Sequence, residues 1–235
     1  DTIKKSVTKR ILDSLKSLKS DSFDEYKGFW KEYGLVLKEG PAEDFENKEL
    51  IASLLLFSSS NSSENSIDQG LDDYLDRMND DQDKIYYCVA DTFEAAANSP
   101  HIEGLKSKGT EVLLLTDRID EWLMAGLMEY KGKELVNVAK EDIADDDSNK
   151  KVSEADQGLV EKIKKHLNEK VSEVVVSSRL TDSASCIVLP KHEPGAQLRK
   201  ILEASGQSLS SSNPIFEINM KHKLVNKLKD LKGKQ

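Results

Sequence analysis

The spacing of apolar residues changes period twice between residues 85 and 127. Residues 85–90 form a short apolar run rich in aromatic and branched side chains, residues 95–106 have helical spacing, and residues 112–115 form a second apolar run. Two short apolar runs joined by a helical segment are typical of parallel strands with a crossover helix. The segment therefore predicts a parallel β-α-β unit, and a further apolar run at residues 135–139 predicts a third strand.

Upstream of this unit, apolar residues recur at intervals of three and four, which places them on one stripe of a helix. Three helices are predicted in succession. The second begins at Phe23 and ends before Gly40 and Pro41, and the third covers about residues 47–57. Residues 1–57 should therefore form a helical layer. The stripe of the first helix consists of Ile3, Val7, Ile11, Leu15 and Leu18.

Residues 58–140 should form a small parallel α-β-α sandwich that begins with a loop. Residues 58–70 are rich in serine and asparagine and are predicted to be exposed, because they offer little apolar surface to pack. A short helix should follow. Its apolar positions are Leu71, Tyr74, Leu75 and Met78.

A charged segment, residues 141–156, has almost no large apolar side chains and is predicted to be a linker. Beyond it, apolar spacing predicts one helix around Leu159, Ile163 and Leu167, two strands, a helix at 194–205 and a third strand at 216–219. Residues 157–235 should therefore form a separate, incomplete α+β domain. The expected fold class is α/β followed by α+β.

Composition narrows the possible functions. With 235 residues, 37% of them hydrophobic, the chain can bury real cores. Its formal net charge of −9 argues against nucleic acid as a partner, because phosphate binding needs a concentrated basic surface. No apolar run approaches the roughly 20 residues that span a bilayer. The basic amphipathic tail, residues 220–235, is better explained as a cut-off helix or a frayed end than as a membrane-binding segment, so no membrane partner is expected.

Few side chains suggest chemistry. The four histidines are scattered and are predicted to be surface or capping residues, and the chain has no metal-binding or phosphate-binding motif. Cys88 and Cys186 lie in separate apolar runs, which favours two buried free thiols and a reducing cytoplasm.

One group of carboxylates leaves an enzymatic alternative open. Asp91, Asp117 and Asp120 follow two predicted parallel strands, at the edge where open α/β sheets bind ligands. Together they could hold Mg²⁺ for phosphotransfer. The favoured interpretation is structural: Asp91 and Asp117 cap the following helices, and Asp120 lies near a positive helix end.

The helix that starts near Ile119 has apolar residues on more than one face. Its inner stripe should consist of Ile119, Leu123, Leu127 and Tyr130, which leaves Trp122 roughly 95° away at about 100° per residue. Met124, Ala125 and Met128 should point further outward. These residues could form an adhesive patch for non-native chains. The alternative is that Trp122 is buried against an adjoining domain.

The helix predicted at 194–205 is a second candidate. Leu198, Ile201 and Leu202 share a face of it, which could equally pack on the neighbouring sheet.

Several long segments together resemble the ninety-kilodalton heat-shock chaperones, in particular their bacterial branch. They occur in the order and spacing of that family and cover nearly the whole chain. The resemblance implies parts of the middle and carboxy-terminal domains. The segments include YKGFWKEYGLVLKEG (26–40), LLLFSSS (54–60), LLLTDRIDEW (113–122), SSRLTDS (177–183), QLRKILEASGQ (197–207) and PIFEIN (214–219).

The resemblance also implies a function, that of a chaperone fragment that binds non-native client proteins. The family's client-binding positions match Glu121, Trp122 and Ala125, and a projecting helix in the family matches Leu198, Ile201 and Leu202. The ATPase domain and the dimerisation helices are expected to lie outside this chain, so no catalytic residue, cofactor or metal is expected in it.

The resemblance further implies that the full-length protein is an ATP- and Mg²⁺-dependent, cytoplasmic homodimer, with co-chaperones as possible partners. The fragment itself is expected to be a monomer or weak dimer. A scaffold whose apolar rim is covered by other domains remains a third possibility.

Overall fold

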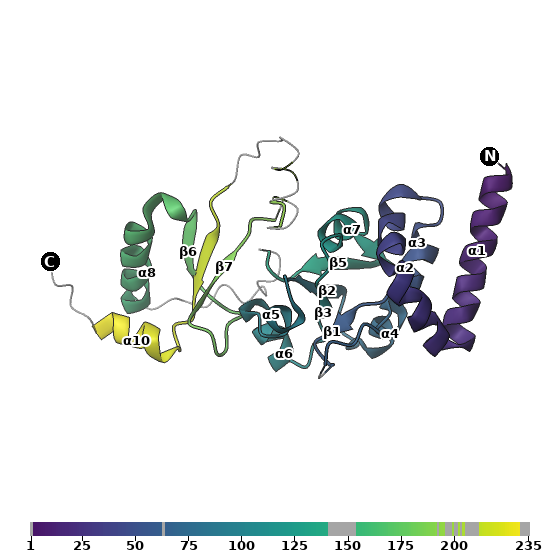
Figure 1. Cartoon of the computed structure of the whole chain (residues 1–235). Coiled ribbons are helices and arrows are strands. Elements are labelled where there is room, and N and C mark those ends of the chain that lie inside the picture. Colours follow the sequence, from purple (N-terminus) through teal and green to yellow (C-terminus); the bar gives the residue numbers. More distant parts are fainter. Residues whose placement is uncertain are drawn as a thin grey trace. The chain divides into compact units, whose positions relative to one another are not determined.

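The computed structural model describes residues 2–62, 64–140, 154–191, 193–195, 199, 202, 204 and 212–230. They form a mixed α/β structure with helices and two small mixed sheets (Figure 1). The chain divides into two compact units. Unit 1 consists of Asp1–Ala96 and Glu111–Leu135, and unit 2 of Ala97–Thr110 and Val136–Gln235. The boundaries expected near residues 57 and 140 remain predictions, and most of the expected linker, residues 141–153, lies outside the described residues.

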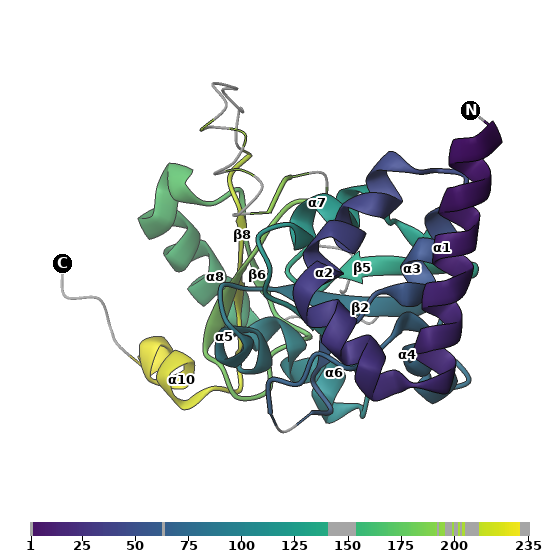
Figure 2. The ribbon, with the colours of Figure 1, turned by 45° about the vertical axis from the view of Figure 1, so that its right-hand side comes forward.

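In unit 1, helices pack with a five-stranded sheet around one core, and Figure 2 shows α1 and α2 in front of β2 and β5. The core takes side chains from α1, α2, α3, α4 and α7, and three of its aromatic members, Tyr26, Tyr74 and Phe57, are at most 1% exposed. The helices are α1 (Thr2–Asp21), α2 (Phe23–Glu43), α3 (Lys48–Leu54), α4 (Leu71–Arg77), α5 (Phe93–Ala97) and α7 (Asp120–Gly126).

The sheet of unit 1 has the strand order β1-β3-β2-β5-β4. Strands β2 and β3 are parallel, with Tyr87 opposite Leu113, which confirms the predicted parallel strands. The single crossover helix predicted at residues 95–106 is instead three short pieces, Phe93–Ala97, Pro100–Ile102 and Glu103–Ser107. The sheet is mixed, because β1 runs antiparallel to β3 and β4 antiparallel to β5. The third predicted strand begins two residues early, at Lys133. The strands are β1 (Ser58–Ser59), β2 (Lys84–Val89), β3 (Leu113–Leu115), β4 (Glu129–Tyr130) and β5 (Lys133–Asn137).

Unit 2 contains a three-stranded sheet of order β6-β8-β7, in which β6 and β8 are parallel and β7 and β8 antiparallel. Helix α8 packs on it through Val160, Ile163 and Leu167. The predicted helix and three strands are therefore confirmed. The elements are η1 (Pro100–Ile102), α6 (Glu103–Ser107), α8 (Glu154–Leu167), η4 (Asn168–Lys170), β6 (Glu173–Val176), β7 (Ser185–Val188), β8 (Ile215–Ile218) and α10 (Lys223–Asp230).

Within unit 2, the crossover helix α6 is held by its first residue. The carboxylate of Glu103 accepts hydrogen bonds from the backbone N–H groups of Thr181 (2.9 Å), Asp182 (2.9 Å) and Ser183 (3.1 Å) and from the Ser183 hydroxyl. Desolvation alone would raise the pKa of Glu103, but these hydrogen bonds outweigh it and hold the pKa below its ordinary value. The crossover and the loop at 177–183 are thus joined through the carboxylate of Glu103.

Helices α2 and α3 end at other places than predicted. Helix α2 continues through Gly40 and Pro41 to Glu43, because Pro41 is buried and the N–H of Asp44 still donates to the Gly40 carbonyl (2.8 Å). Helix α3 ends at Leu54 instead of continuing to Phe57. Residues 55–57 are buried and extended, since Phe57 pairs with Gln69 as an isolated bridge that leads into β1. In both cases tertiary packing decides the end of the helix.

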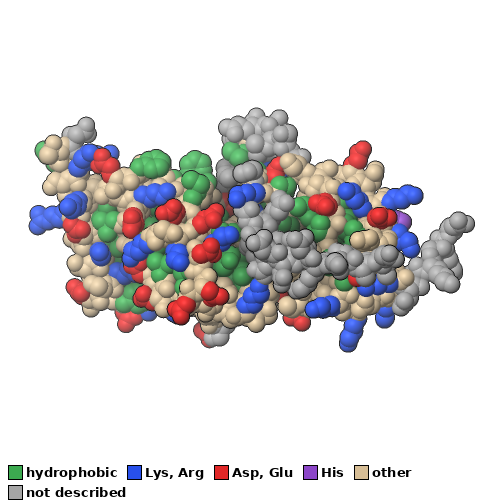
Figure 3. All heavy atoms as spheres, turned by 180° about the vertical axis from the view of Figure 1, so that it is seen from behind, with side chains coloured by type: hydrophobic (Ala, Val, Ile, Leu, Met, Phe, Trp, Pro, Cys, Tyr) green, Lys and Arg blue, Asp and Glu red, His purple; other side chains and the backbone are tan. Residues whose placement is uncertain are grey.

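The predicted stripe of α1 is buried only in its second half. Leu15 and Leu18 pack on the core, together with the buried Leu12. Ile3 and Ile11 are 81% and 54% exposed, and Val7 is 50% exposed, so the first half of the stripe does not pack on the described core. Figure 3 shows hydrophobic side chains reaching the surface among acidic and basic ones.

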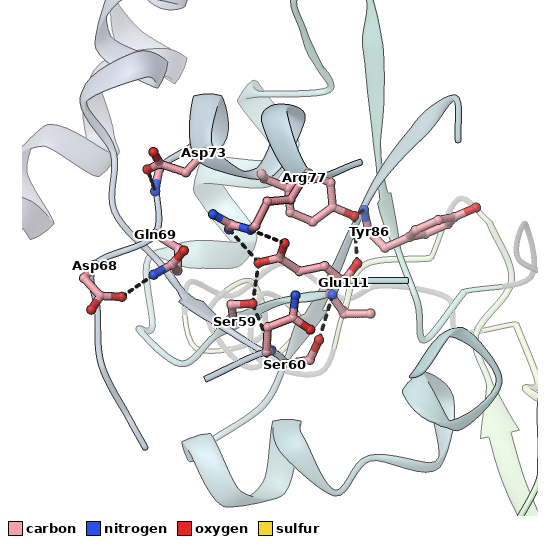
Figure 4. Close-up of polar contacts among 12 residues, drawn as sticks. Ser59, Ser60, Asp68, Gln69, Asp73, Arg77, Tyr86 and Glu111 are labelled. Carbon is pink, nitrogen blue, oxygen red and sulfur yellow. Dashed lines mark hydrogen bonds and ion pairs between the residues drawn. The ribbon is translucent and has the colours of Figure 1, made fainter. Parts of the chain in front are cut away.

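The serine-rich segment is not entirely an exposed loop. Ser58 and Ser59 form β1 and are 3% and 1% exposed. The Ser59 hydroxyl donates to Glu111 Oε1 (2.5 Å), and the same carboxylate accepts from Arg77 Nε (2.9 Å) and Nη2 (2.8 Å), as Figure 4 shows. A buried serine is tolerated when its hydroxyl has a partner. The polarity of the segment therefore did not reveal its burial.

The thiols and histidines follow the predictions in part. Cys88 and Cys186 are free and buried, as predicted. His222 caps α10, because its Nδ1 accepts the N–H of Leu224 (3.2 Å). His101 differs: desolvation, with a smaller contribution from Arg179, lowers its pKa to about 4, so the ring is a partly buried neutral group and not a surface one. His192 lies outside the described residues.

Candidate functional site

The start of α7 is fixed by a buried lysine and two aspartates. Lys38 Nζ lies 2.6 Å from both Asp117 Oδ2 and Asp120 Oδ1. The other oxygen of Asp120 accepts the backbone N–H of Asp117 (2.9 Å), which closes the turn between β3 and α7. Since Lys38 lies on α2, this ion cluster fastens the first turn of α7 to α2.

The cluster is almost completely removed from water. Lys38 is 3% exposed and Asp120 is 0% exposed, and the ammonium group lies 5.4 Å from the ring centre of Phe57 and 6.0 Å from that of Trp30. Burial raises the pKa of Asp120, and the contact with Lys38 opposes this shift. A buried charge is stable only when it is paired, so each member of the cluster depends on the others.

These contacts do not support the magnesium-dependent phosphotransfer alternative. Asp117 and Asp120 are engaged with Lys38, whose ammonium group lies where a cation would have to bind. Within the described part of the chain, no group of three or more His, Cys, Asp and Glu side chains could hold a metal ion. The predicted capping role of Asp117 is also wrong, because Ile119 is the residue before α7. Asp91 is exposed after the end of β2.

The inner face of α7 packs more closely than predicted. Leu123 and Leu127 are buried, as expected, but Met124 is only 6% exposed although it was expected to point outward. The helix ends at Gly126, so Tyr130 is buried on β4 and not on the helix. A Cβ on Gly126 would lie 2.9 Å from the Cβ of Ala42 on α2, so a hydrogen is needed there for the two helices to approach.

The outer side of α7 leaves apolar side chains in water. Trp122 is 50% exposed and Met128, just after the helix, is 66% exposed; Ala125 is exposed and Glu121 half-buried. Trp122 precedes Gly126 by one helical turn and so lies on the side of α7 that borders α2. There α2 contributes Leu35, which is 58% exposed. We call Leu35, Trp122, Ala125 and Met128 the α2–α7 surface.

The second candidate site is described only in part. Leu202 lies in a helix and is half-buried, whereas Leu198 and Ile201 lie outside the described residues. Its proposed role therefore remains a prediction.

A polar cavity of about 500 Å³ in unit 1 was not anticipated from the sequence. It is lined by three cationic and three acidic side chains, which compensate one another. Lys19 Nζ donates to the Ser53 carbonyl (2.6 Å), and burial lowers the pKa of this lysine. The charged lining residues are Lys16, Lys19, Arg77, Asp68, Asp72 and Asp73.

Comparison with known proteins identifies the family. The family model described as "Hsp90 protein" matches residues 1–235. The chain belongs to the Hsp90 family. It is 50% identical over 232 residues to the chaperone protein HtpG of Shewanella denitrificans, an alignment covering 95% of this chain and 36% of that protein. It is 47% identical to HtpG of Shewanella loihica (96% and 37% covered) and 49% identical to HtpG of Shewanella frigidimarina (94% and 36% covered).

The Hsp90 assignment confirms the resemblance to the heat-shock chaperones that the quoted sequence segments indicated. The chain spans about a third of the length of these curated relatives. Among the described residues, no helix is long and apolar enough to cross a membrane.

Proposed function

We propose that this Hsp90-family chain binds non-native polypeptides through the α2–α7 surface. The exposure of Trp122 at the side of a firmly held helix is the observation that carries the proposal. An indole with half its surface in water can bury a large area on contact with an apolar segment, and Met128 adapts its shape to different partners. Lys38 and Gly126 hold α7 against α2. Binding a client therefore does not have to order this helix first, and little backbone entropy is lost.

In this proposal Glu121, Trp122 and Ala125 contact the client, and Leu198, Ile201 and Leu202 supply a second apolar contact. The chain itself performs no chemistry. In the longer protein, ATP and Mg²⁺ bound elsewhere drive closure of a cytoplasmic homodimer around the client, with co-chaperones as further partners. Nucleic acid and membranes are not partners. The similarity to the HtpG chaperones supports these roles.

The decisive experiment compares two arginine substitutions at exposed apolar positions of unit 1. Trp122→Arg removes the largest apolar area of the surface and should weaken binding of a permanently unfolded protein at least about tenfold, since losing one aromatic anchor costs about 2 kcal/mol or more. Ile3→Arg, on α1 and also exposed, should leave the affinity within about twofold. Affinity is measured by fluorescence anisotropy of the labelled client. Equal affinities for the wild type and Trp122→Arg would reject the proposed surface.

A further inference from the structure

Acidic side chains accumulate around the α2–α7 surface. On α2, Glu32, Glu39 and Glu43 are all exposed, and their spacing of seven and four residues places them on one stripe of the helix. Glu121 lies next to Trp122, and the exposed Glu129 follows Met128.

Contacts between the two helices place this acidic stripe beside Trp122. Lys38 meets Asp120 at the start of α7, and Ala42 meets Gly126 at its end, so α2 and α7 run in the same direction. Trp122, one turn before Gly126, is therefore level with the turn of α2 that precedes Ala42. That turn contains Glu39, and Leu35 lies one turn further back.

Cations near this surface are fewer. The exposed basic residues on the neighbouring segments are Lys27 and Lys31 on α2, Arg118 before α7 and Lys131 after β4. Two of them already have acidic partners, since Lys27 pairs with Asp24 and Lys131 with Asp72. Lys38 is buried and its charge is already matched by Asp117 and Asp120. The apolar area is thus bordered by a predominantly negative rim, whose field extends about 10 Å at 0.1 M salt.

We propose that the α2–α7 surface selects polypeptide segments in which a short apolar stretch is flanked by lysine or arginine. The apolar stretch covers Trp122 and Leu35, and the flanking cations lie against the glutamates of the rim. Acidic flanks are repelled, so the surface discriminates between segments of equal hydrophobicity. This inference rests on the proposed client-binding function and specifies its substrate class.

Three labelled peptides with the same apolar core and with lysine, serine or glutamate flanks test this selectivity on the whole chain. Fluorescence anisotropy at 50 mM salt should rank their affinities lysine, serine, glutamate, with about a tenfold difference between the first and the last, because several exposed charge pairs each contribute modestly. At 500 mM salt the difference should shrink to about twofold.

Neutralising the rim provides the matched variant. Glu39→Gln, Glu43→Gln and Glu129→Gln together should reduce the ratio of lysine-flanked to glutamate-flanked affinity at least threefold. Asp81→Asn removes an exposed charge on the loop before β2, which does not belong to the rim, and should leave this ratio unchanged.

The outcomes separate the two claims. Equal affinities for all three peptides, each weakened by Trp122→Arg, would refute the charge selectivity and leave client binding intact. A charge ranking that survives neutralisation of the rim would also refute it. If no peptide binds, the proposed function fails, and the selectivity with it.

Discussion

At the scale of single residues, the role of Lys38 depends on its surroundings. A lysine in an amphipathic helix is normally solvated, but this one is 3% exposed and lies 2.6 Å from each of two carboxylates. The same carboxylates suggested a magnesium site from sequence. Nothing in the spacing of Asp117 and Asp120 indicates that a lysine about 80 residues upstream supplies the cation, because that pairing exists only after α2 packs on α7.

Replacing Lys38 with methionine should strongly destabilise the protein. The change keeps an unbranched side chain, one atom shorter, but leaves Asp120 buried without a counter-charge, which typically costs about 3–5 kcal/mol. Urea unfolding measures the loss. Lys31→Met, an exposed lysine of the same helix, is the control and should barely change the midpoint. Adding Asp120→Asn to Lys38→Met should recover part of the loss; no recovery would mean that the cluster is not the cause.

For Trp122 and Met124, the exposure predicted from helical geometry can be compared with the structure. Helical geometry placed Trp122 at the rim of α7, and it is 50% exposed. The same geometry placed Met124 outside, yet it is buried, because neighbouring elements cover a wider arc of a short helix than one stripe. Local angles fix which residues share a face, and the neighbours determine how much of the helix they cover.

At the scale of elements, the parallel β-α-β unit followed directly from apolar spacing. Strand β1 and the end of α2 did not. The buried Ser59 donates to Glu111, which follows about 50 residues later, so its own segment predicted only a loop. Pro41 predicted a helix end, yet it lies buried inside α2. Elements whose apolar residues recur at a regular spacing were predicted from the sequence. Elements that are stabilised by residues far away in the sequence were not.

Glycine substitutions test the close approach of α2 and α7. Gly126→Ala should lower the free energy of unfolding by up to about 2 kcal/mol, since the clash with Ala42, typically about 1–3 kcal/mol, outweighs the usual helical gain of about 1 kcal/mol. Gly28→Ala, where a Cβ meets nothing within 4 Å, should instead raise it by about 0.5–1 kcal/mol. Chemical denaturation of both variants checks the opposite signs. A stabilising Gly126→Ala would contradict the described contact.

At the scale of the whole molecule, unit 2 includes the crossover residues 97–110 although these connect two strands of unit 1. Glu103 explains part of this grouping, because its carboxylate binds three consecutive N–H groups of the loop at 177–183. Residues 97–110 are therefore linked to unit 1 through the chain and to the rest of unit 2 through packing.

The isolated chain should be a monomer or weak dimer. Its net charge of −9 opposes self-association at low salt, and the longer relatives contain about two thirds of their length outside this region. Sedimentation at micromolar concentration should give a mass near 26.3 kDa. A stable dimer at 1 μM would show that this region alone contains a dimer interface.

The sequence by itself determined the family, the β-α-β unit, the helices with strong apolar periods and the placing of Trp122 at the edge of a helix. These properties are set by local spacing and by the order of segments along the chain. Tertiary structure alone decided that Lys38 neutralises Asp117 and Asp120, that Ser58 and Ser59 are buried, and that Gly126 lies against Ala42. Each of these depends on contacts between segments far apart in sequence, and such contacts form only when the helices and the sheet pack together.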